Sequence, residues 1–174
     1  TIATVNAPPF GWGPIVRITG TAGIDVIDGA GLNANGITFT LVGATNGIWA
    51  LGGDGIDLLW GTARREWLGG GAGDGVIIAG GGDDRVIGGL GNDQLHGQAG
   101  NDSMSGDGGM DLMFGGLGND VMAGGDDADQ LYGEEGNDTL GGDGGDDFLV
   151  GGIGNDLLNG GLGNDVLAGD AGND

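Results

Sequence analysis

The sequence of 174 residues contains no cysteine and no lysine, and its only basic side chains are four arginines. Because cysteine is absent, the chain has neither a disulfide framework nor a thiolate metal site. Arg17, Arg64, Arg65 and Arg85 stand against 26 acidic residues, which gives a formal net charge of −22. Contacts to phosphate require clustered cations, so the sequence predicts that nucleic acid is not a partner.

Long apolar runs and enzyme motifs are absent as well. No stretch approaches the roughly 18 apolar residues that cross a bilayer, so no transmembrane segment is predicted. The N-terminal residues lack the charged and then apolar pattern of a signal peptide. Neither His-Glu-x-x-His nor Gly-x-Ser-x-Gly occurs, and the single histidine, His96, is interpreted as a surface residue. The sequence therefore predicts that this chain is not itself an enzyme.

Glycine and acidic residues are abundant, and this composition normally predicts disorder. From Gly52 onward, however, the sequence repeats with a period of nine, through 13 complete units and one unit of six residues. The sixth position is Asp in 12 of 14 units, and the fourth is Gly in 12 of 14. The eighth position is always aliphatic or Met: Leu59, Leu68, Ile77, Val86, Leu95, Met104, Met113, Met122, Leu131, Leu140, Leu149, Leu158 and Leu167. The repeat therefore predicts an ordered array.

Each part of this nine-residue unit has a physical role. One apolar residue between two outward neighbours suits a three-residue strand with one side chain in the core, and the other six residues are then expected to turn. Glycines at the first and fourth positions permit positive φ and let carbonyl oxygens point to a common centre. The sixth-position carboxylate adds a further oxygen, and hard oxygen ligands favour calcium over zinc or copper.

The unit Gly88-Gly89-Leu90-Gly91-Asn92-Asp93-Gln94-Leu95-His96 resembles the RTX family of secreted calcium-binding proteins, whose repeat reads Gly-Gly-x-Gly-x-Asp-x-U-x. The resemblance implies an all-β fold, a right-handed parallel β-roll, or β-solenoid, with two short-stranded sheets and calcium-binding turns. It also implies two units per coil and an ion between turns one coil apart. Type I secretion and an extracellular or cell-surface location are implied in the same way.

The family analogy pairs aspartates 18 positions apart and gives nine full pairs, so about nine calcium ions are expected. Nine divalent ions would bring the charge of −22 to about −4, a balance that suits a compact acidic rod. The predicted metal ligands are Asp84, Asp93, Asp102, Asp111, Asp120, Asp129, Asp138, Asp147, Asp156, Asp165 and Asp174, with turn carbonyls such as those of Gly88, Leu90, Gly106, Gly108, Gly116 and Gly118. Weaker candidates are Asp25, Asp57 and Glu66. Each unit buries only one side chain, so we expect the array to be unfolded without metal and folded with it.

The chain before the array is expected to divide in two. Residues 1–19 are interpreted as a linker or the approach to a cap, and residues 20–51 as an irregular N-terminal β cap with one out-of-phase repeat at 20–28. The array itself spans residues 52–174. Strands are expected at residues 15–18, 37–42 and 48–51, and the second alternates as an exposed edge strand does.

The unit at residues 61–69 keeps its core leucine but loses the turn glycines. Two interpretations are open. Arg64 or Arg65 supplies the positive charge that calcium supplies elsewhere, or the repeat has decayed and its arginines are solvated.

Outward positions seven and nine separate into two sheets, because alternate units feed opposite sheets. One sheet is apolar at 11 of 14 of these places, including Trp60, Phe114, Tyr132 and Phe148. A continuous apolar face predicts a contact surface, for self-association or for other parts of the parent chain. The alternative is that β-propensity alone places these residues in strands.

The sequence as a whole predicts an extracellular calcium-binding structural module that mediates assembly or surface attachment, of the surface-layer, adhesin or filament type. The alternative is the export and folding repeat of a larger secreted hydrolase or toxin. A third possibility is an ice- or mineral-binding surface, although only Thr139 among the outward positions could begin a threonine ladder. Because the last unit stops at Asp174, we expect the chain to be a piece of a longer protein.

Overall fold

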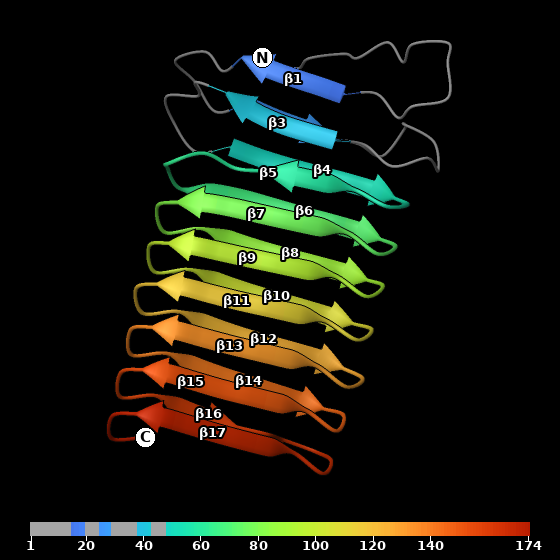
Figure 1. The fold of residues 1–174 in the computed structure, drawn as a ribbon. Coiled ribbons are helices and arrows are strands. Elements are labelled where there is room, and N and C mark those ends of the chain that lie inside the picture. Colours follow the sequence, from blue (N-terminus) through green and yellow to red (C-terminus); the bar gives the residue numbers. More distant parts are fainter. Residues whose placement is uncertain (1–14, 20–24, 29–37, 43–47) are drawn as a thin grey trace.

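The computed structural model is a parallel β-solenoid in which two sheets face each other across a single core (Figure 1). It describes residues 15–19, 25–28, 38–42 and 48–174, with side chains from Ala50 onward. This all-β architecture of two parallel sheets confirms the predicted fold class. No helix among these residues could cross a membrane.

Both sheets are entirely parallel, and consecutive strands alternate between them. The nine-stranded sheet contains β1 (Ile15–Thr19), β3 (Thr38–Val42), β5 (Leu58–Trp60), β7 (Val76–Gly81), β9 (Gln94–Ala99), β11 (Leu112–Leu117), β13 (Gln130–Glu135), β15 (Phe148–Ile153) and β17 (Val166–Ala171). The eight-stranded sheet contains β2 (Asp25–Asp28), β4 (Ile48–Asp54), β6 (Glu66–Ala72), β8 (Arg85–Leu90), β10 (Ser103–Gly108), β12 (Val121–Asp126), β14 (Thr139–Gly144) and β16 (Leu157–Asn159).

The register confirms that two nine-residue units make one coil. Met113 of β11 pairs with Leu95 on one side and Leu131 on the other, and each step is 18 residues. The same step joins β8, β10 and β12 in the opposite sheet. Every equivalent position therefore forms a straight column along the solenoid.

The eighth-position side chains form the core, as predicted for eleven of the thirteen. Those from Leu59 to Leu149 are at most 3% exposed, and they come alternately from the two sheets. Leu158 is only partly buried against this core, and Leu167 is 45% exposed. The prediction is wrong for Leu167, because its strand β17 has a neighbour on one side only.

The strands are longer than the predicted three residues. β9 to β15 each span six residues, so pairing continues from the seventh position of one unit to the third position of the next. Only the fourth to sixth positions turn, as at residues 100–102. The first-position glycine is buried and the second position has positive φ, as in Gly116 at 115°. This local reversal lets the chain go on pairing where the sequence predicted a turn.

The strands before Gly52 extend the two sheets. β3 pairs with both β1 and β5, so the strand expected at an edge is an inner one. β2 pairs with β4 at a step of 23 residues, from Asp25 to Ile48, and the five additional residues account for the phase shift of the first repeat. The expected division into a linker, a cap and an array remains a prediction.

Candidate metal centres

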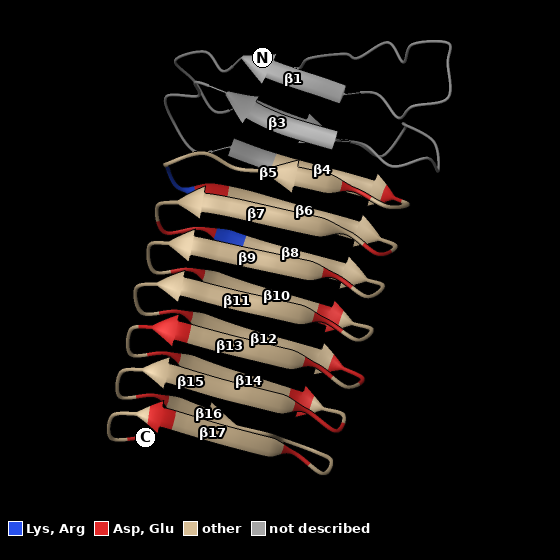
Figure 2. Ribbon diagram, in the orientation of Figure 1, with Lys and Arg blue, Asp and Glu red and all other residues tan. Residues whose placement is uncertain are grey.

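The solenoid has two rows of turns, one along each long edge. We call the first edge the row whose turns end at Asp84, Asp102, Asp120, Asp138, Asp156 and Asp174, and the second edge the row whose turns end at Asp93, Asp111, Asp129, Asp147 and Asp165. Acidic residues gather along both rows, whereas the middle of each strand carries few (Figure 2). The turns therefore concentrate the negative charge of the chain.

Within each row the sixth-position aspartates form a ladder. One carboxylate oxygen, Oδ1, accepts a hydrogen bond from the backbone N–H of the aspartate one coil earlier, as when Asp84 donates to Asp102 at 2.8 Å and Asp102 donates to Asp120 at 2.7 Å. All nine predicted pairs are brought together in this way, with distances between 2.7 and 3.0 Å. That each pair shares one ion stays a prediction.

The second carboxylate oxygen, Oδ2, has no hydrogen-bond partner in nine of these aspartates. They are Asp84, Asp93, Asp102, Asp111, Asp120, Asp129, Asp138, Asp147 and Asp156, and each side chain is at most 5% exposed. Burying a charged oxygen without a partner is costly, and native structures avoid it unless a proton, an ion or another donor satisfies it. These nine oxygens therefore mark places where a cation fits.

Burial has the expected effect on the acidity of these groups. Desolvation raises the pKa of Asp84 to about 8, that of Asp120 and Asp129 to about 7 and that of Asp111 to about 6. Neighbouring carboxylates add to the rise, and the backbone hydrogen bond in the ladder opposes it. A bound cation would reverse this balance, because it favours the ionised form.

The first-position glycines make room beside these oxygens. A Cβ atom on Gly97 would overlap Oδ2 of Asp102 and would lie 2.6 Å from the carbonyl oxygen of Gly115. A Cβ on Gly106 would meet Asp111 in the same way. One carboxylate oxygen and one carbonyl oxygen from the next coil thus converge beside the α-carbon of each of these glycines, where there is no room for a side chain. Among the described residues no group of three or more Asp, Glu, His or Cys side chains is placed to hold a metal ion by itself, so a complete donor set would need backbone carbonyls. Hard, carbonyl-rich oxygen donors are those that calcium prefers.

The backbone carbonyl oxygens predicted as metal ligands make two kinds of contact. Those of Gly88 and Gly106 approach the α-carbons of the glycines one coil earlier, and that of Gly118 approaches Gly136. Those of Leu90 and Gly108 accept backbone hydrogen bonds at 2.5 and 2.8 Å, which leaves each a second lone pair.

Gly116, also predicted as a carbonyl ligand, has positive φ, and its α-carbon faces the carbonyl oxygen of Gln98. It is therefore part of the same close approach between coils.

The three weaker candidates differ from one another. Asp25 lies on β2, where only the backbone is described. Asp57 is buried, and a Cβ on Gly52 would overlap its Oδ2. Glu66 is hydrogen-bonded inside its own turn, since Thr62 donates to Oε2 through its N–H at 3.0 Å and to Oε1 through its hydroxyl at 2.6 Å.

The fifth positions form a second ladder that sequence reasoning missed. On the first edge Asn101 donates its backbone N–H to Oδ1 of Asp83, and Asn119 donates to Asn101, at 2.9 and 2.8 Å. The column continues to residue 173 with the same contacts. On the second edge Met110 and Ala128 interrupt it. The sequence does indicate this ladder, because Asn or Asp occupies the fifth position in 10 of 14 units.

Parallel sheets joined by glycine-rich turns, with rows of buried carboxylate oxygens that have no hydrogen-bond partner, define a calcium-binding β-roll. The family described as RTX calcium-binding nonapeptide repeat (4 copies) matches residues 69–104, 105–140 and 141–174. These matches cover more than half of the chain, which therefore belongs to the RTX calcium-binding repeat family. No curated protein matches the sequence. The chain is a calcium-binding repeat module.

Proposed function

We propose that this chain is an extracellular structural module that is unfolded in the absence of calcium, folds when calcium binds along both edges and then assembles through one sheet face. About nine ions bind per chain, each near one buried Oδ2 atom. The module has no enzymatic activity of its own. The observation that carries this proposal is the column of buried carboxylate oxygens without hydrogen-bond partners on each edge.

The family supports the proposed location, because its repeats are typical of type I secreted proteins. Extracellular calcium modules have dissociation constants of about 10⁻⁴ to 10⁻³ M, well above cytosolic calcium levels. A chain with such sites stays unfolded inside a cell and folds outside.

Circular dichroism during a calcium titration tests the folding part. In excess chelator at pH 7.5 we expect the spectrum of a disordered chain, and millimolar calcium should convert it to a β-sheet spectrum. Magnesium at the same concentration is the control, because it demands a tighter octahedral geometry and should not substitute. A β-sheet spectrum in chelator that calcium leaves unchanged would refute the proposal.

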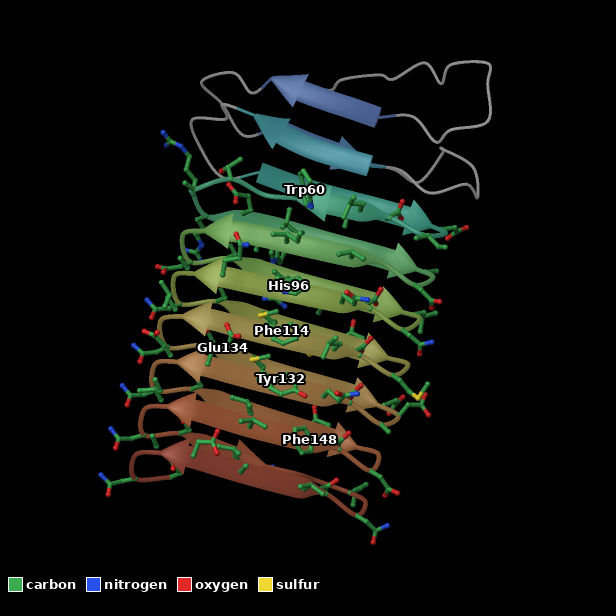
Figure 3. All side chains as sticks on the ribbon, viewed as in Figure 1. Trp60, His96, Phe114, Tyr132, Glu134 and Phe148 are labelled. Atoms are coloured by element: carbon green, nitrogen blue, oxygen red, sulfur yellow. The ribbon has the colours of Figure 1, made fainter. Side chains whose placement is uncertain are left out.

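The assembly part rests on the outer face of the nine-stranded sheet. His96, Phe114 and Tyr132 stack along it with ring centroids 4.9 and 5.1 Å apart, and Phe148 follows at 6.0 Å (Figure 3). Trp60 on the same face is 44% exposed. From β5 to β17 this face carries no charged residue at positions seven and nine, and burial lowers the pKa of His96.

We propose a second copy of the chain as the occupant of this face. Two chains of charge −22 repel each other wherever their acidic edges meet. Positions seven and nine of this face carry no charge, and Glu134 and Glu135 lie at the C-terminal end of β13, so two copies that meet along these positions oppose few like charges. Sedimentation in millimolar calcium should show dimers or larger species, and Phe114→Ser with Phe148→Ser should abolish them while the core stays intact. Val121→Ser on the opposite sheet, where Val121 is 53% exposed, is the matched control. A wild-type monomer at high concentration would contradict assembly and favour the export-module alternative.

A further inference from the structure

Six residues other than glycine adopt the left-handed backbone conformation among the described residues. They are Gln98, Asp107, Asp127, Glu134, Asp143 and Asp170, with φ between 67° and 77°. Such a backbone costs free energy for any residue with a Cβ, and glycine holds most equivalent positions in this chain. Five of the six carry a negative charge, although glycine would relieve the strain.

Five of these residues, all except Asp127, occupy second positions of the repeat and alternate there with glycine, whereas Asp127 occupies a fourth position. In one column of second positions the order is Gly89, Asp107, Gly125, Asp143 and Gly161, and in the other it is Gly80, Gln98, Gly116, Glu134, Gly152 and Asp170. A Cβ on Gly125 would overlap the carbonyl oxygen of Asp107, and a Cβ on Gly152 would overlap that of Glu134. From Gly80 in one column and Gly89 in the other, a side chain is thus accommodated on every second coil. Gln98 occupies such a place at a φ of 77°, so the backbone itself does not require an acid.

The acids at these positions lie close to particular metal centres. Asp107 and Asp143 stand four residues before Asp111 and Asp147, each of which has a buried Oδ2 without a hydrogen-bond partner. Each acid raises the pKa of that neighbouring aspartate, although burial is the larger cause. Ser105 holds the carboxylate of Asp107 with a hydrogen bond of 2.5 Å from its hydroxyl.

Asp127 and Glu134 act on two further centres. Asp127 stands two residues before Asp129, and Glu134 lies across a coil boundary from Asp120. Asp129 and Asp120 also have buried Oδ2 atoms without hydrogen-bond partners. Asp127 and Glu134 are exposed to solvent, and Glu134 lies on β13 beside Tyr132 in Figure 3. They are therefore close enough to be felt electrostatically and too solvated to act as buried ligands.

We propose that Asp107, Asp127, Glu134 and Asp143 are outer carboxylates whose electric field raises the calcium affinity of the sites at Asp111, Asp129, Asp120 and Asp147. The inference rests on calcium binding at the sixth positions, as proposed above. Each outer carboxylate attracts a divalent ion without contacting it, and in the metal-free chain it repels the neighbouring aspartate. The strained backbone is the cost of this arrangement, and folding at a lower calcium concentration is its result.

The test neutralises the four charges without changing the backbone: Asp107→Asn, Asp127→Asn, Glu134→Gln and Asp143→Asn in one chain. Coulomb interaction with a doubly charged ion at roughly one Debye length gives about two- to threefold per charge. Folding takes up about nine ions together, so a two- to threefold loss of affinity at each of four sites should raise the calcium midpoint for folding about 1.5-fold in low salt. The shift should shrink strongly in 1 M NaCl, where the Debye length is about 3 Å. Equilibrium dialysis counts the bound calcium ions directly and so provides a second readout beside the circular-dichroism signal of folding.

Gln98 supplies the matched controls. Gln98→Gly relieves the same strain without removing a charge, so it should not raise the calcium midpoint. Gln98→Glu adds an outer carboxylate, placed relative to Asp84 as Glu134 is placed relative to Asp120. It should raise the calcium affinity of that one site about two- to threefold and lower the folding midpoint slightly. If the wild type responds to calcium but the neutralised chain has the same midpoint, or a shift that salt does not change, the inference is wrong. If the wild type itself fails to bind calcium, the proposed function is also wrong.

Discussion

The coil that contains β6 and the turn at residues 73–75 differs from the coils after Asp84 in how its sixth positions are satisfied. In the former, Glu66 receives two hydrogen bonds from Thr62, and the next sixth position, Gly75, has no side chain. In the latter, each sixth position from Asp84 to Asp156 is an aspartate with a buried oxygen and no partner for it.

The backbone is the same in both regions. β6 pairs with β8 at the same 18-residue step as β8 with β10, and the N–H of Gly75 donates to Asp93 at 2.6 Å just as an aspartate would. The same backbone therefore accommodates two kinds of sixth position. In one kind, side-chain hydrogen bonds pair the carboxylate oxygens, and in the other a buried oxygen has no such partner and requires a cation.

Arginines distinguish the first region further. Burial raises the pKa of Glu66, while the Thr62 hydrogen bonds and then the charge of Arg64 lower it. The guanidinium of Arg85 lies 5.2 Å from the ring centroid of Trp67, across the β6–β8 pair. The charge of Arg64 favours the ionised form of Glu66, as a cation would, and the Thr62 hydrogen bonds do so more strongly. We therefore expect the first region to depend little on calcium.

The largest effect should come from pH in the absence of calcium. The pKa values of the buried aspartates are raised in the folded chain, to between about 6 and about 8 where they are largest, so the folded state binds more protons than the unfolded one. Their stabilising contribution is therefore present below about pH 4 and is lost as pH rises through about 8. In chelator, acidification from pH 8.5 to 4.5 should increase the β-sheet signal in circular dichroism. A signal that falls on acidification would contradict this sign.

Removing one charge from each region should change the number of bound calcium ions in the second region but not in the first. Asp111→Asn keeps the oxygen that accepts the N–H of Asp93 but loses the charge, so equilibrium dialysis should show one or two fewer calcium ions per chain. Glu66→Gln, the matched control, should leave the number of bound ions unchanged. Equal losses for the two variants would remove the distinction between the regions.

A carboxylate added at a sixth position of the first region should create a calcium site like those after Asp84. Gly75 has no positive φ, and a Cβ there would lie 3.0 Å from Oδ1 of Asp93, a contact that a flexible side chain relieves by a small shift. We expect Gly75→Asp to bind one more calcium ion than the wild type, measured by dialysis, whereas Gly75→Asn, of the same size, should bind no more. An unchanged ion count for Gly75→Asp would show that a carboxylate at this position is not sufficient.

The smallest expected effect concerns the fifth-position ladder. Asn119→Ala on the first edge removes the acceptor of the Asn137 N–H, and the loss of an exposed hydrogen bond should cost about 0.5–1 kcal/mol in the calcium-loaded chain. Ala128→Asn on the second edge fills a gap in the ladder and should stabilise by a similar or smaller amount. Denaturant unfolding in millimolar calcium measures both changes, and a stabilising Asn119→Ala would contradict the role of the ladder.

Much of this arrangement could be predicted from the sequence because the repeat has no insertion after Gly52. A strict period of nine places Leu95, Met113 and Leu131 in one column, and it also fixes which aspartates become neighbours. The pairing of Asp84 with Asp102 and its eight equivalents needed only the additional assumption of two units per coil.

Other features depend on backbone geometry that residue types do not reveal. Glycine is equally compatible with a turn and with a paired strand of positive φ, so the six-residue strands were not predicted. The sequence does not distinguish the two carboxylate oxygens of an aspartate, yet only Oδ1 accepts a hydrogen bond in the ladder. β2 pairs with β4 at a step of 23 residues instead of 18, and local sequence does not determine which coil contains additional residues.

Hydrogen exchange at the backbone amides of the sixth-position aspartates tests the central claim most directly. The N–H groups of Asp84, Asp102 and Asp120 each donate to a carboxylate one coil later, so they exchange slowly only when consecutive coils are folded together. At pH 7.5 we expect these amides to be strongly protected in 10 mM calcium and to exchange in excess chelator at the rate of an unfolded chain. Equal protection in calcium and in chelator would show that the roll folds without the ion and would contradict the account.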